Sequence, residues 1–238
     1  MGAVGDSWIR RLRTAEDPRT RLVCCPPAGA TAMFFLQLAQ AIARPVEVVG
    51  VQYPGRRDRR HEPAVTSVTA MADELTAALA DDLPTALFGH GMGAAVAFET
   101  AVRLERAGGK PLALFASGAP SPSRLGTAGF PAHDPSDLIP PTRDPAPTPL
   151  SALRDDRTAA ETYRWHPADR VRCHILALAG DTDPAVTVDE ATAWGELTTG
   201  RFELQVFSGG QTFLSTYVST VANTISERIT ALCKGRAY

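Results

Sequence analysis

The chain has no excess of charge of one sign and no long hydrophobic run. Its 238 residues include 24 Lys and Arg against 26 Asp and Glu, which gives a net charge of −2. A basic footprint for nucleic acid is therefore missing, and no apolar run approaches the roughly 20 residues that a membrane span requires. We expect neither nucleic acid nor a membrane as a partner.

Cysteine is also scarce, with four residues in the whole chain. Cys24 and Cys25 are adjacent, whereas Cys173 and Cys233 lie far away, so no spacing suggests a zinc site or a disulfide framework. We expect no metal and no cofactor. Residues 1–20 are polar and lack the apolar core of a signal peptide. A cytoplasmic location is the resulting prediction, with Cys24 and Cys25 as strand core residues rather than nucleophiles.

The most informative absence is a serine. Residues 86–95 read ALFGHGMGAA, in which an apolar run ends in a Gly-x-Gly-x-Gly turn and passes into a helical pattern. The nucleophile elbow of α/β-hydrolases has this layout, with serine at the centre, but here the centre is Gly91. Gly89 and Gly93 provide the small side positions of a sharp turn. Glycine at the tip would relieve backbone strain of about 1–3 kcal/mol.

A phosphate-binding turn is the alternative interpretation of these glycines. The spacing of Gly89, Gly91 and Gly93 does not match the dinucleotide-binding fingerprint, and no lysine follows as in a Walker loop. The sequence therefore favours an elbow without its serine.

Apolar runs with the spacing of strands and of helices alternate along the chain. This alternation predicts a mostly parallel sheet covered by helices on both faces, within a single α/β domain over residues 1–238. The predicted strands are 21–25, 46–51, 86–88, 112–116, 174–179 and 202–207, and the predicted helices are 33–43, 68–79, 94–107, 150–163 and a final one through Tyr217, Val221, Ile225 and Ile229.

The alternation breaks between Ser117 and Pro149, where nine prolines exclude long helices. A long segment of this kind inside a compact domain is either a functional lid or disordered. We predict a short, proline-rich lid inserted over residues 118–165.

With these landmarks placed, the whole chain resembles the type II (editing) thioesterases of polyketide and nonribosomal peptide pathways. The resemblance implies an α/β-hydrolase fold, a lid, and an acyl group carried on the phosphopantetheine arm of an acyl or peptidyl carrier protein. It rests on the segments WIRR (8–11), CCPPAG (24–29), QYPGRRDRR (52–60), the elbow, ETYR (161–164), GDTDP (180–184) and GGQTFL (209–214).

The departures from that family bear on its chemistry. The resemblance places the family's nucleophilic serine at Gly91, its catalytic histidine at Gln211 and its acid at the retained Asp183, and it puts Pro27 where a histidine is usual. A serine thioesterase needs a nucleophile and a base to take its proton. Losing either one alone costs about a millionfold in rate in subtilisin, so we expect no acyl-enzyme hydrolysis.

Backbone groups are unaffected by these replacements. In such elbows the amide of the residue after the nucleophile, here Met92, and one from the first loop, here Ala28, form the oxyanion hole. With Asp183 or His90 as a base and Gln211 orienting the substrate, this hole would support non-covalent carbonyl chemistry of the cyclase, epimerase or lyase type. The substrate would be carrier-bound or a free polyketide-like small molecule.

Structural interpretations stand beside each of these roles. His90 would be a buried hydrogen-bonded strut, Asp183 a cap for its own turn, and Gln211 a filler of the histidine's space. The basic run Arg56–Arg60 would be a solvated face or would contact the phosphate of a carrier-borne arm. Two other functions also remain open: a non-catalytic protein that binds the intermediate, and residual hydrolysis by water activated by Asp183.

Overall fold

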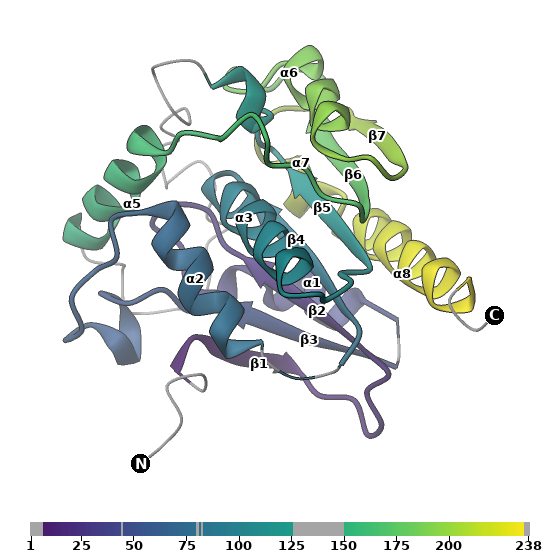
Figure 1. The fold of residues 1–238 in the computed structure, drawn as a ribbon, viewed down its shortest axis with the longest axis horizontal. Coiled ribbons are helices and arrows are strands. Elements are labelled where there is room, and N and C mark those ends of the chain that lie inside the picture. Colours follow the sequence, from purple (N-terminus) through teal and green to yellow (C-terminus); the bar gives the residue numbers. More distant parts are fainter. Residues whose placement is uncertain (1–6, 44, 80, 82, 126–149, 236–238) are drawn as a thin grey trace.

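A computed structural model of the protein describes residues 7–43, 45–79, 81, 83–125 and 150–235. Its strands form one seven-stranded sheet in the order β1-β3-β2-β4-β5-β6-β7 (Figure 1). Only β1 is antiparallel to its neighbour among the described strands. The bounds are β1 Ile9–Arg13, β2 Thr20–Cys25, β3 Val46–Val51, β4 Thr85–His90, β5 Ala113–Ser117, β6 His174–Gly180 and β7 Phe202–Phe207. The predicted α/β-hydrolase fold is confirmed.

Helices cover both faces of the sheet (Figure 1). α2 and α3 pack on one face and share a core cluster, whereas α1 and α8 pack on the other face with a second cluster. The helices are α1 Leu36–Ala41, α2 Val68–Ala78, α3 Met92–Arg106, α5 Leu150–Thr162, α6 Val188–Thr192, α7 Phe213–Thr216 and α8 Val218–Lys234, with short 3₁₀ turns at Ala32–Phe35, Arg57–Arg59, Pro122–Arg124 and Ala193–Leu197.

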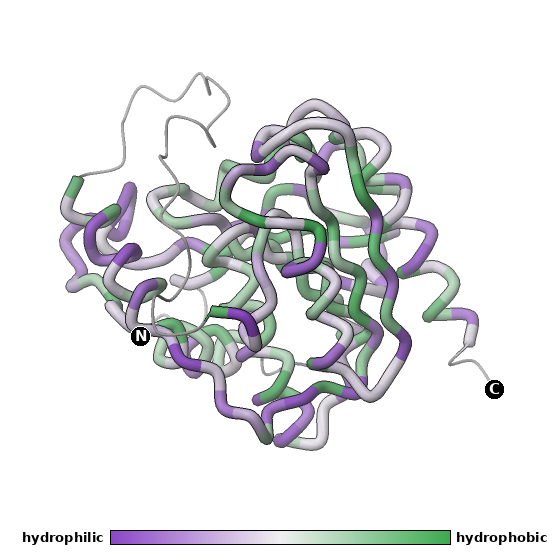
Figure 2. Tube along the Cα trace, turned by 90° about the horizontal axis from the view of Figure 1, so that it is seen from above, coloured by the Kyte–Doolittle hydropathy of each residue, from purple (hydrophilic) through white to green (hydrophobic). Residues whose placement is uncertain are grey.

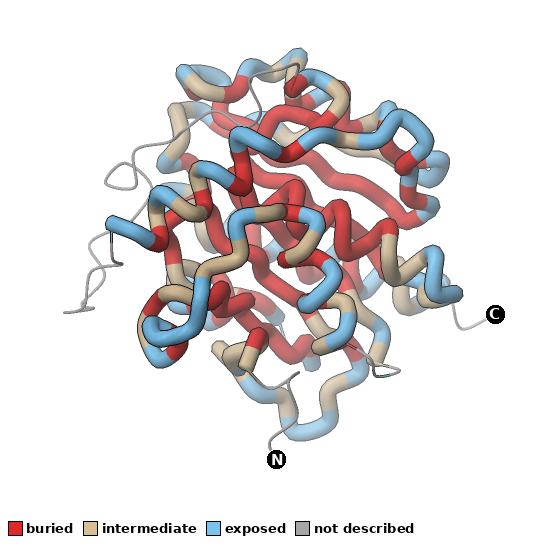
Figure 3. Tube along the Cα trace, turned by 60° about the vertical axis from the view of Figure 1, so that its left-hand side comes forward, coloured by how far each residue is buried: buried red, intermediate tan, exposed pale blue. Residues whose placement is uncertain are grey.

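Strand residues alternate between these two clusters because successive side chains point to opposite faces. Leu22 and Cys24 pack with α1 and α8, whereas Val23 and Cys25 pack with α2 and α3. Both cysteines are fully buried, as predicted, and burial raises the pKa of each thiol. Figure 2 colours the chain by hydropathy, and Figure 3 shows that the buried segments lie in the interior with the exposed segments around them.

Several elements differ from the prediction, among them α6, which was not predicted, and the pair α7 and α8, where one final helix was expected. Residues 33–43 form a 3₁₀ turn followed by the short helix α1, which ends at Ala41. Strand β1, with the sequence IRRLR, was not predicted. Three of its five residues are arginines, so it lacks the apolar run of the other strands, and charged residues are common on edge strands. Helix α5 matches the predicted helix closely.

The prediction of a lid over residues 118–165 falls partly outside the described residues, which lack 126–149. The assignment of 1–238 to one domain therefore remains a prediction. In the described part of the chain, no helix combines the length and the apolarity needed to cross a membrane.

Candidate functional site

The residues singled out from the sequence gather at the carboxyl edge of the sheet. Ala28 follows β2, Gly91 follows β4, Asp183 follows β6 and Gln211 follows β7. Because these strands are parallel, the loops after them meet at the same edge, which is where open α/β sheets bind their ligands. β4 is the fourth strand of the seven, so Gly91 lies at the middle of this edge.

Gly91 is the tip of a sharp strand-to-helix turn. Its φ of 55° and ψ of −126° place it in the left-handed region that favours glycine. A Cβ at Gly89 would lie 2.2 Å from the carbonyl oxygen of Gly93, and one at Gly93 would lie 2.0 Å from that of Cys25. Both flanking positions therefore require glycine, as the elbow pattern predicts.

Two backbone amides at this turn have no acceptor among the residues that the structure describes. Met92 is the first residue of α3, and Ala28 lies in the loop that follows β2. Neither N–H donates a hydrogen bond to any residue that the structure describes. The close contact of Gly93 with the carbonyls of Cys25 and Pro26 packs the start of α3 against this loop. The positive end of the helix dipole and the amides of its first turn favour an anion here.

His90 is held between a strand and aromatic rings. Its Nδ1 lies 3.0 Å from the Oγ of Ser117, which ends β5, and its ring stacks on Phe34 with 5.7 Å between centroids. A Cβ at Gly118 would lie 2.6 Å from His90 Cε1. Ser117 is fully buried, so this hydroxyl–imidazole pair is closed to an acyl substrate. The geometry agrees with the structural interpretation of His90.

Gln211 lies beside His90. The two residues line a small cavity of about 30 Å³ between the start of α1 and α7, a space that suits roughly one water molecule. Gln211 is half-buried. An amide at this position can donate and accept hydrogen bonds, but it does not take up a proton at neutral pH.

Asp183 lies on the loop that contacts the loop of Gln211. The N–H of Thr182 donates to the carbonyl of Gly209 at 3.2 Å, and a Cβ at Gly210 would lie 4.0 Å from the Cα of Asp183. The Asp183 carboxylate is buried, and its Oδ1 accepts the N–H of Ala185 at 2.9 Å. Its Oδ2 has no hydrogen bond to a described residue. Asp183 thus caps its own turn with Oδ1, whereas Oδ2 is not used in that cap.

The basic run after β3 is largely structural. Arg56 and Arg59 are 1% and 6% exposed, so the interpretation of this run as a solvated face is wrong for both. Arg59 stacks over Trp8 at 4.9 Å and pairs with Glu62. Arg56 forms an ion pair with Asp156 of α5. The run of four arginines around Asp58 suggested exposure, and no local signal in the sequence indicated a partner as distant as Asp156 of α5.

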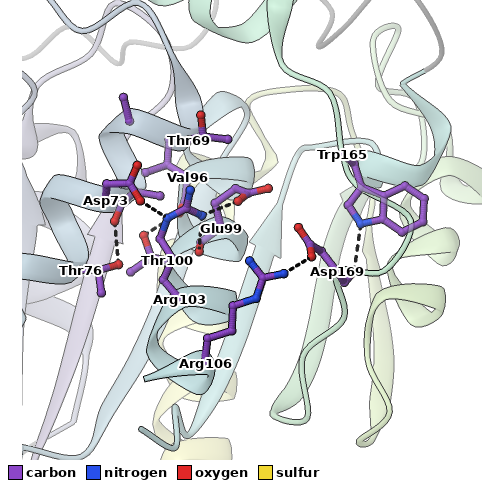
Figure 4. Close-up of polar contacts among 12 residues, drawn as sticks. Thr69, Asp73, Thr76, Val96, Glu99, Thr100, Arg103, Arg106, Trp165 and Asp169 are labelled. Atoms are coloured by element: carbon purple, nitrogen blue, oxygen red, sulfur yellow. Dashed lines mark hydrogen bonds and ion pairs between the residues drawn. The ribbon is translucent and has the colours of Figure 1, made fainter. Parts of the chain in front are cut away.

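Helix α3, which carries Met92 at its start, is anchored by a polar network (Figure 4). Arg103 forms ion pairs with Glu99 on its own helix and with Asp73 on α2. Glu99 is 4% exposed and also accepts the hydroxyl of Tyr163 at 2.7 Å. This network fixes α3 against α2 and against the chain after α5.

The described residues contain no group of three or more His, Cys, Asp or Glu side chains arranged to hold a metal ion. The polar groups at this edge include the amides of Ala28 and Met92 and the side chains of Asp183, Gln211 and His90.

Comparison with known proteins places the chain in a family. Residues 20–138 match the thioesterase domain. The chain is 40% identical over 237 residues to a "Probable cadicidin biosynthesis thioesterase" of Streptomyces griseus, covering 93% of this chain and 66% of that protein. It is 37% identical over 239 residues to "Thioesterase PikA5" of Streptomyces venezuelae, covering 93% and 85%.

Solved structures agree. The type II thioesterase BorB from the borrelidin biosynthetic cluster superposes with a TM-score of 0.82 at 39% identity, covering 97% of this chain and 98% of BorB. YbtT, the type II thioesterase of the yersiniabactin pathway, superposes with a TM-score of 0.80 at 25% identity, covering 94% and 99%. The chain therefore belongs to the thioesterase family and shares the fold of its type II members.

Proposed function

We propose that this chain acts in polyketide or nonribosomal peptide biosynthesis and performs non-covalent carbonyl chemistry, of the cyclase, epimerase or lyase type, in place of serine hydrolysis. The observation that carries the proposal is an elbow whose tip, Gly91, has no side chain, beside two amides, Ala28 and Met92, that donate to no described acceptor. The substrate is a carrier-bound acyl intermediate or a free polyketide-like molecule.

The loss of hydrolysis follows from the positions of Gly91 and Gln211. In this proposal they occupy the nucleophile and base positions of the family, so neither an acyl-enzyme nor base-assisted attack forms. His90 does not substitute for the base, since its Nδ1 faces Ser117 and its ring is packed between aromatic side chains.

An enolate step uses what remains. The carboxylate of Asp183 takes the α-proton of the acyl group, and the electron pair of the broken C–H bond forms the C=C bond of the enolate. The charge moves to the carbonyl oxygen, where the N–H groups of Ala28 and Met92 stabilise it. One donor of such a hole is typically worth about 3–4 kcal/mol. Return of the proton from Asp183 restores the acyl group, and the configuration is inverted when the planar enolate turns its other face to Asp183 before it is reprotonated.

A deuterium experiment tests this step. Wild-type protein is incubated in D₂O with a 2-methylacyl-pantetheine thioester of one configuration, and deuterium content and configuration are followed by mass spectrometry and chiral chromatography. We expect exchange above the protein-free rate, abolished in Asp183→Asn and retained in Asp189→Asn, a control that removes an exposed carboxylate of α6.

The other functions predict different results. Binding of the thioester without exchange favours a non-catalytic protein that holds the intermediate, a role consistent with the engagement of Asp183 with Ala185. Hydrolysis without labelling by a serine-directed phosphonate favours water attack through Asp183. Labelling of the wild-type protein by the phosphonate would overturn the proposal.

A further inference from the structure

One carboxylate of α5 joins that helix to the loop after β2. Asp156 is 1% exposed, and its two oxygens accept a bidentate pair of hydrogen bonds from Arg56, with Nη2 to Oδ1 at 2.6 Å and Nη1 to Oδ2 at 2.7 Å. Oδ2 also accepts the backbone N–H of Gly29 at 2.7 Å. A lid-side helix thus contacts the backbone of the loop that carries Ala28.

Arg56 and Tyr53 hold the same loop from the other side. Arg56 Nη1 donates to the carbonyl of Ala30 at 2.9 Å, and its guanidinium lies over the ring of Tyr53 at 5.2 Å. The Tyr53 hydroxyl donates to the carbonyl of Pro26 at 3.2 Å. These contacts with loop 26–30, together with those of Asp156, are called the Asp156 network below.

The contact with Gly29 fixes the peptide plane between Ala28 and Gly29, because that N–H belongs to it. Gly29 has a φ of 77°, so the loop turns sharply at this point. The Ala28 N–H belongs to the preceding peptide unit, which is joined to this plane through the φ and ψ of Ala28 and whose Pro27 carbonyl accepts the N–H of Ala30 at 3.1 Å. The Asp156 network therefore acts on the peptide unit next to the one that carries the proposed oxyanion donor.

Apolar packing contributes little to the seating of α5. Apart from Asp156, its buried residues are Ala152, Ala159 and Ala160. Alanine side chains bury little area, and apolar burial is worth about 25 cal/mol per Å². Breaking one partner of a buried ion pair costs about 3–5 kcal/mol. The position of α5 and that of the loop are consequently joined through polar contacts.

We infer that Asp156 and Arg56 are positioning residues that couple the seating of α5 to the orientation of the Ala28 amide, so that the carbonyl site is formed only when α5 is docked. This inference rests on the proposed function for the role of Ala28. The coupling itself rests on the contacts of Asp156 with Gly29 and Arg56.

Its test needs a variant that remains folded without the network. Asp156→Asn leaves a buried guanidinium without a countercharge, whereas the double variant Arg56→Met with Asp156→Leu removes both charges. Apolar replacement of a buried pair is often neutral or stabilising. The double variant therefore separates the effect of the pair on the orientation of the loop from its effect on the stability of the fold. Asp81→Asn is the control, because it removes a half-exposed carboxylate that pairs with Arg21 near the other end of β2.

Two measurements are made on each variant. The first is the carbonyl stretching frequency of a ¹³C-labelled acyl-pantetheine thioester bound to the protein, with affinity from calorimetry. The second is amide hydrogen exchange of residues 28–33. In the double variant we expect a thermal midpoint near wild type, loss of the bound-state carbonyl shift with affinity changed by less than about threefold, and loop exchange faster by at least about tenfold. The control matches wild type in both.

The outcomes distinguish the two proposals. Absence of a carbonyl shift in the wild-type protein contradicts the proposed oxyanion site, while the hydrogen exchange still tests the coupling. A folded double variant with wild-type loop exchange overturns the coupling, whatever the carbonyl shift. If the double variant unfolds, Asp156→Glu takes its place, and wild-type exchange and shift in that longer side chain also count against the inference.

Discussion

At the scale of single residues, the backbone of Gly91 retains the conformation of a nucleophile elbow. A φ of 55° is costly for a residue with a side chain, and the steric limits at Gly89 and Gly93 show that the whole turn is as tight as the elbow pattern requires. Replacing the tip residue by glycine releases strain without changing the path of the chain. The turn therefore keeps the shape that presents a nucleophile, although the nucleophilic hydroxyl is absent.

The double variant Gly91→Ser with Gln211→His tests whether positions 91 and 211 still have the geometry of a nucleophile and its base. Serine at this φ costs about 1–3 kcal/mol of stability, and with Asp183 the two new side chains complete a Ser-His-Asp set. We expect labelling by a fluorophosphonate and hydrolysis of short acyl-pantetheine thioesters at least about a hundredfold above wild type. Intact-protein mass spectrometry and a thiol-release assay measure both.

The matched control is Gly91→Ala with Gln211→His, which carries the same backbone strain but no hydroxyl. It should fold with similar stability and stay unlabelled. A folded serine–histidine variant that neither labels nor hydrolyses would mean that positions 91 and 211 do not face each other as nucleophile and base.

At the scale of elements, α5 is held by polar contacts at its middle and just beyond its C-terminal end. At its middle Asp156 binds Arg56, and just beyond its end the Tyr163 hydroxyl donates to Glu99 of α3 at 2.7 Å. Burial, followed by the charge of Glu99, raises the pKa of Tyr163, so the phenol stays protonated and remains a donor at neutral pH. α5 is thereby joined to both the loop after β2 and the elbow helix.

Tyr163→Phe is expected to lower the free energy of unfolding by about 1–3 kcal/mol, because it leaves one oxygen of the buried Glu99 without a donor. Urea denaturation measures the change. Tyr217→Phe is the control, since no described residue hydrogen-bonds to that half-buried phenol, and its effect should stay within about 0.5 kcal/mol. Equal effects in the two variants would count against the Tyr163–Glu99 contact as an anchor.

The sequence predicted the local features of these elements and missed the contacts between them. Strand 202–207 and helix 150–163 follow from their composition and periodicity, and the small residues beside Gly91 follow from the geometry of a tight turn. The pairing of His90 with Ser117 depends on the register of β4 against β5. The pairing of Arg56 with Asp156 spans 100 residues. Neither has a signal in local sequence, because each arises only when distant segments fold together.

At the scale of the whole molecule, the two edges of the sheet differ in chemistry. The carboxyl edge carries the glycine turn, the two amides and Asp183. At the opposite edge, a cleft of about 630 Å³ lies beside the starts of β6 and β7 and is lined by His174, Glu203, Arg201 and Arg228 among others. Glu203 pairs there with both arginines, so a change of charge at this edge affects stability far from the candidate site.

His174 makes that stability depend on pH. Burial is the largest cause that lowers its pKa below the usual value, and Arg201 and Arg228 lower it further, while Glu203 opposes them. The folded state thus binds fewer protons than the unfolded state between the lowered pKa and about 6.5. The free energy of unfolding must therefore fall as the pH drops through this window.

Urea denaturation between pH 7 and pH 5 measures this dependence in wild type and in His174→Gln. Linkage to one proton contributes at most about 1.4 kcal/mol per pH unit, and we expect the variant to lose that part of the slope. His166→Gln, which alters an exposed imidazole, should keep it. If the free energy of unfolding of His174→Gln changed with pH as steeply as that of wild type, the acid sensitivity would arise in groups other than His174.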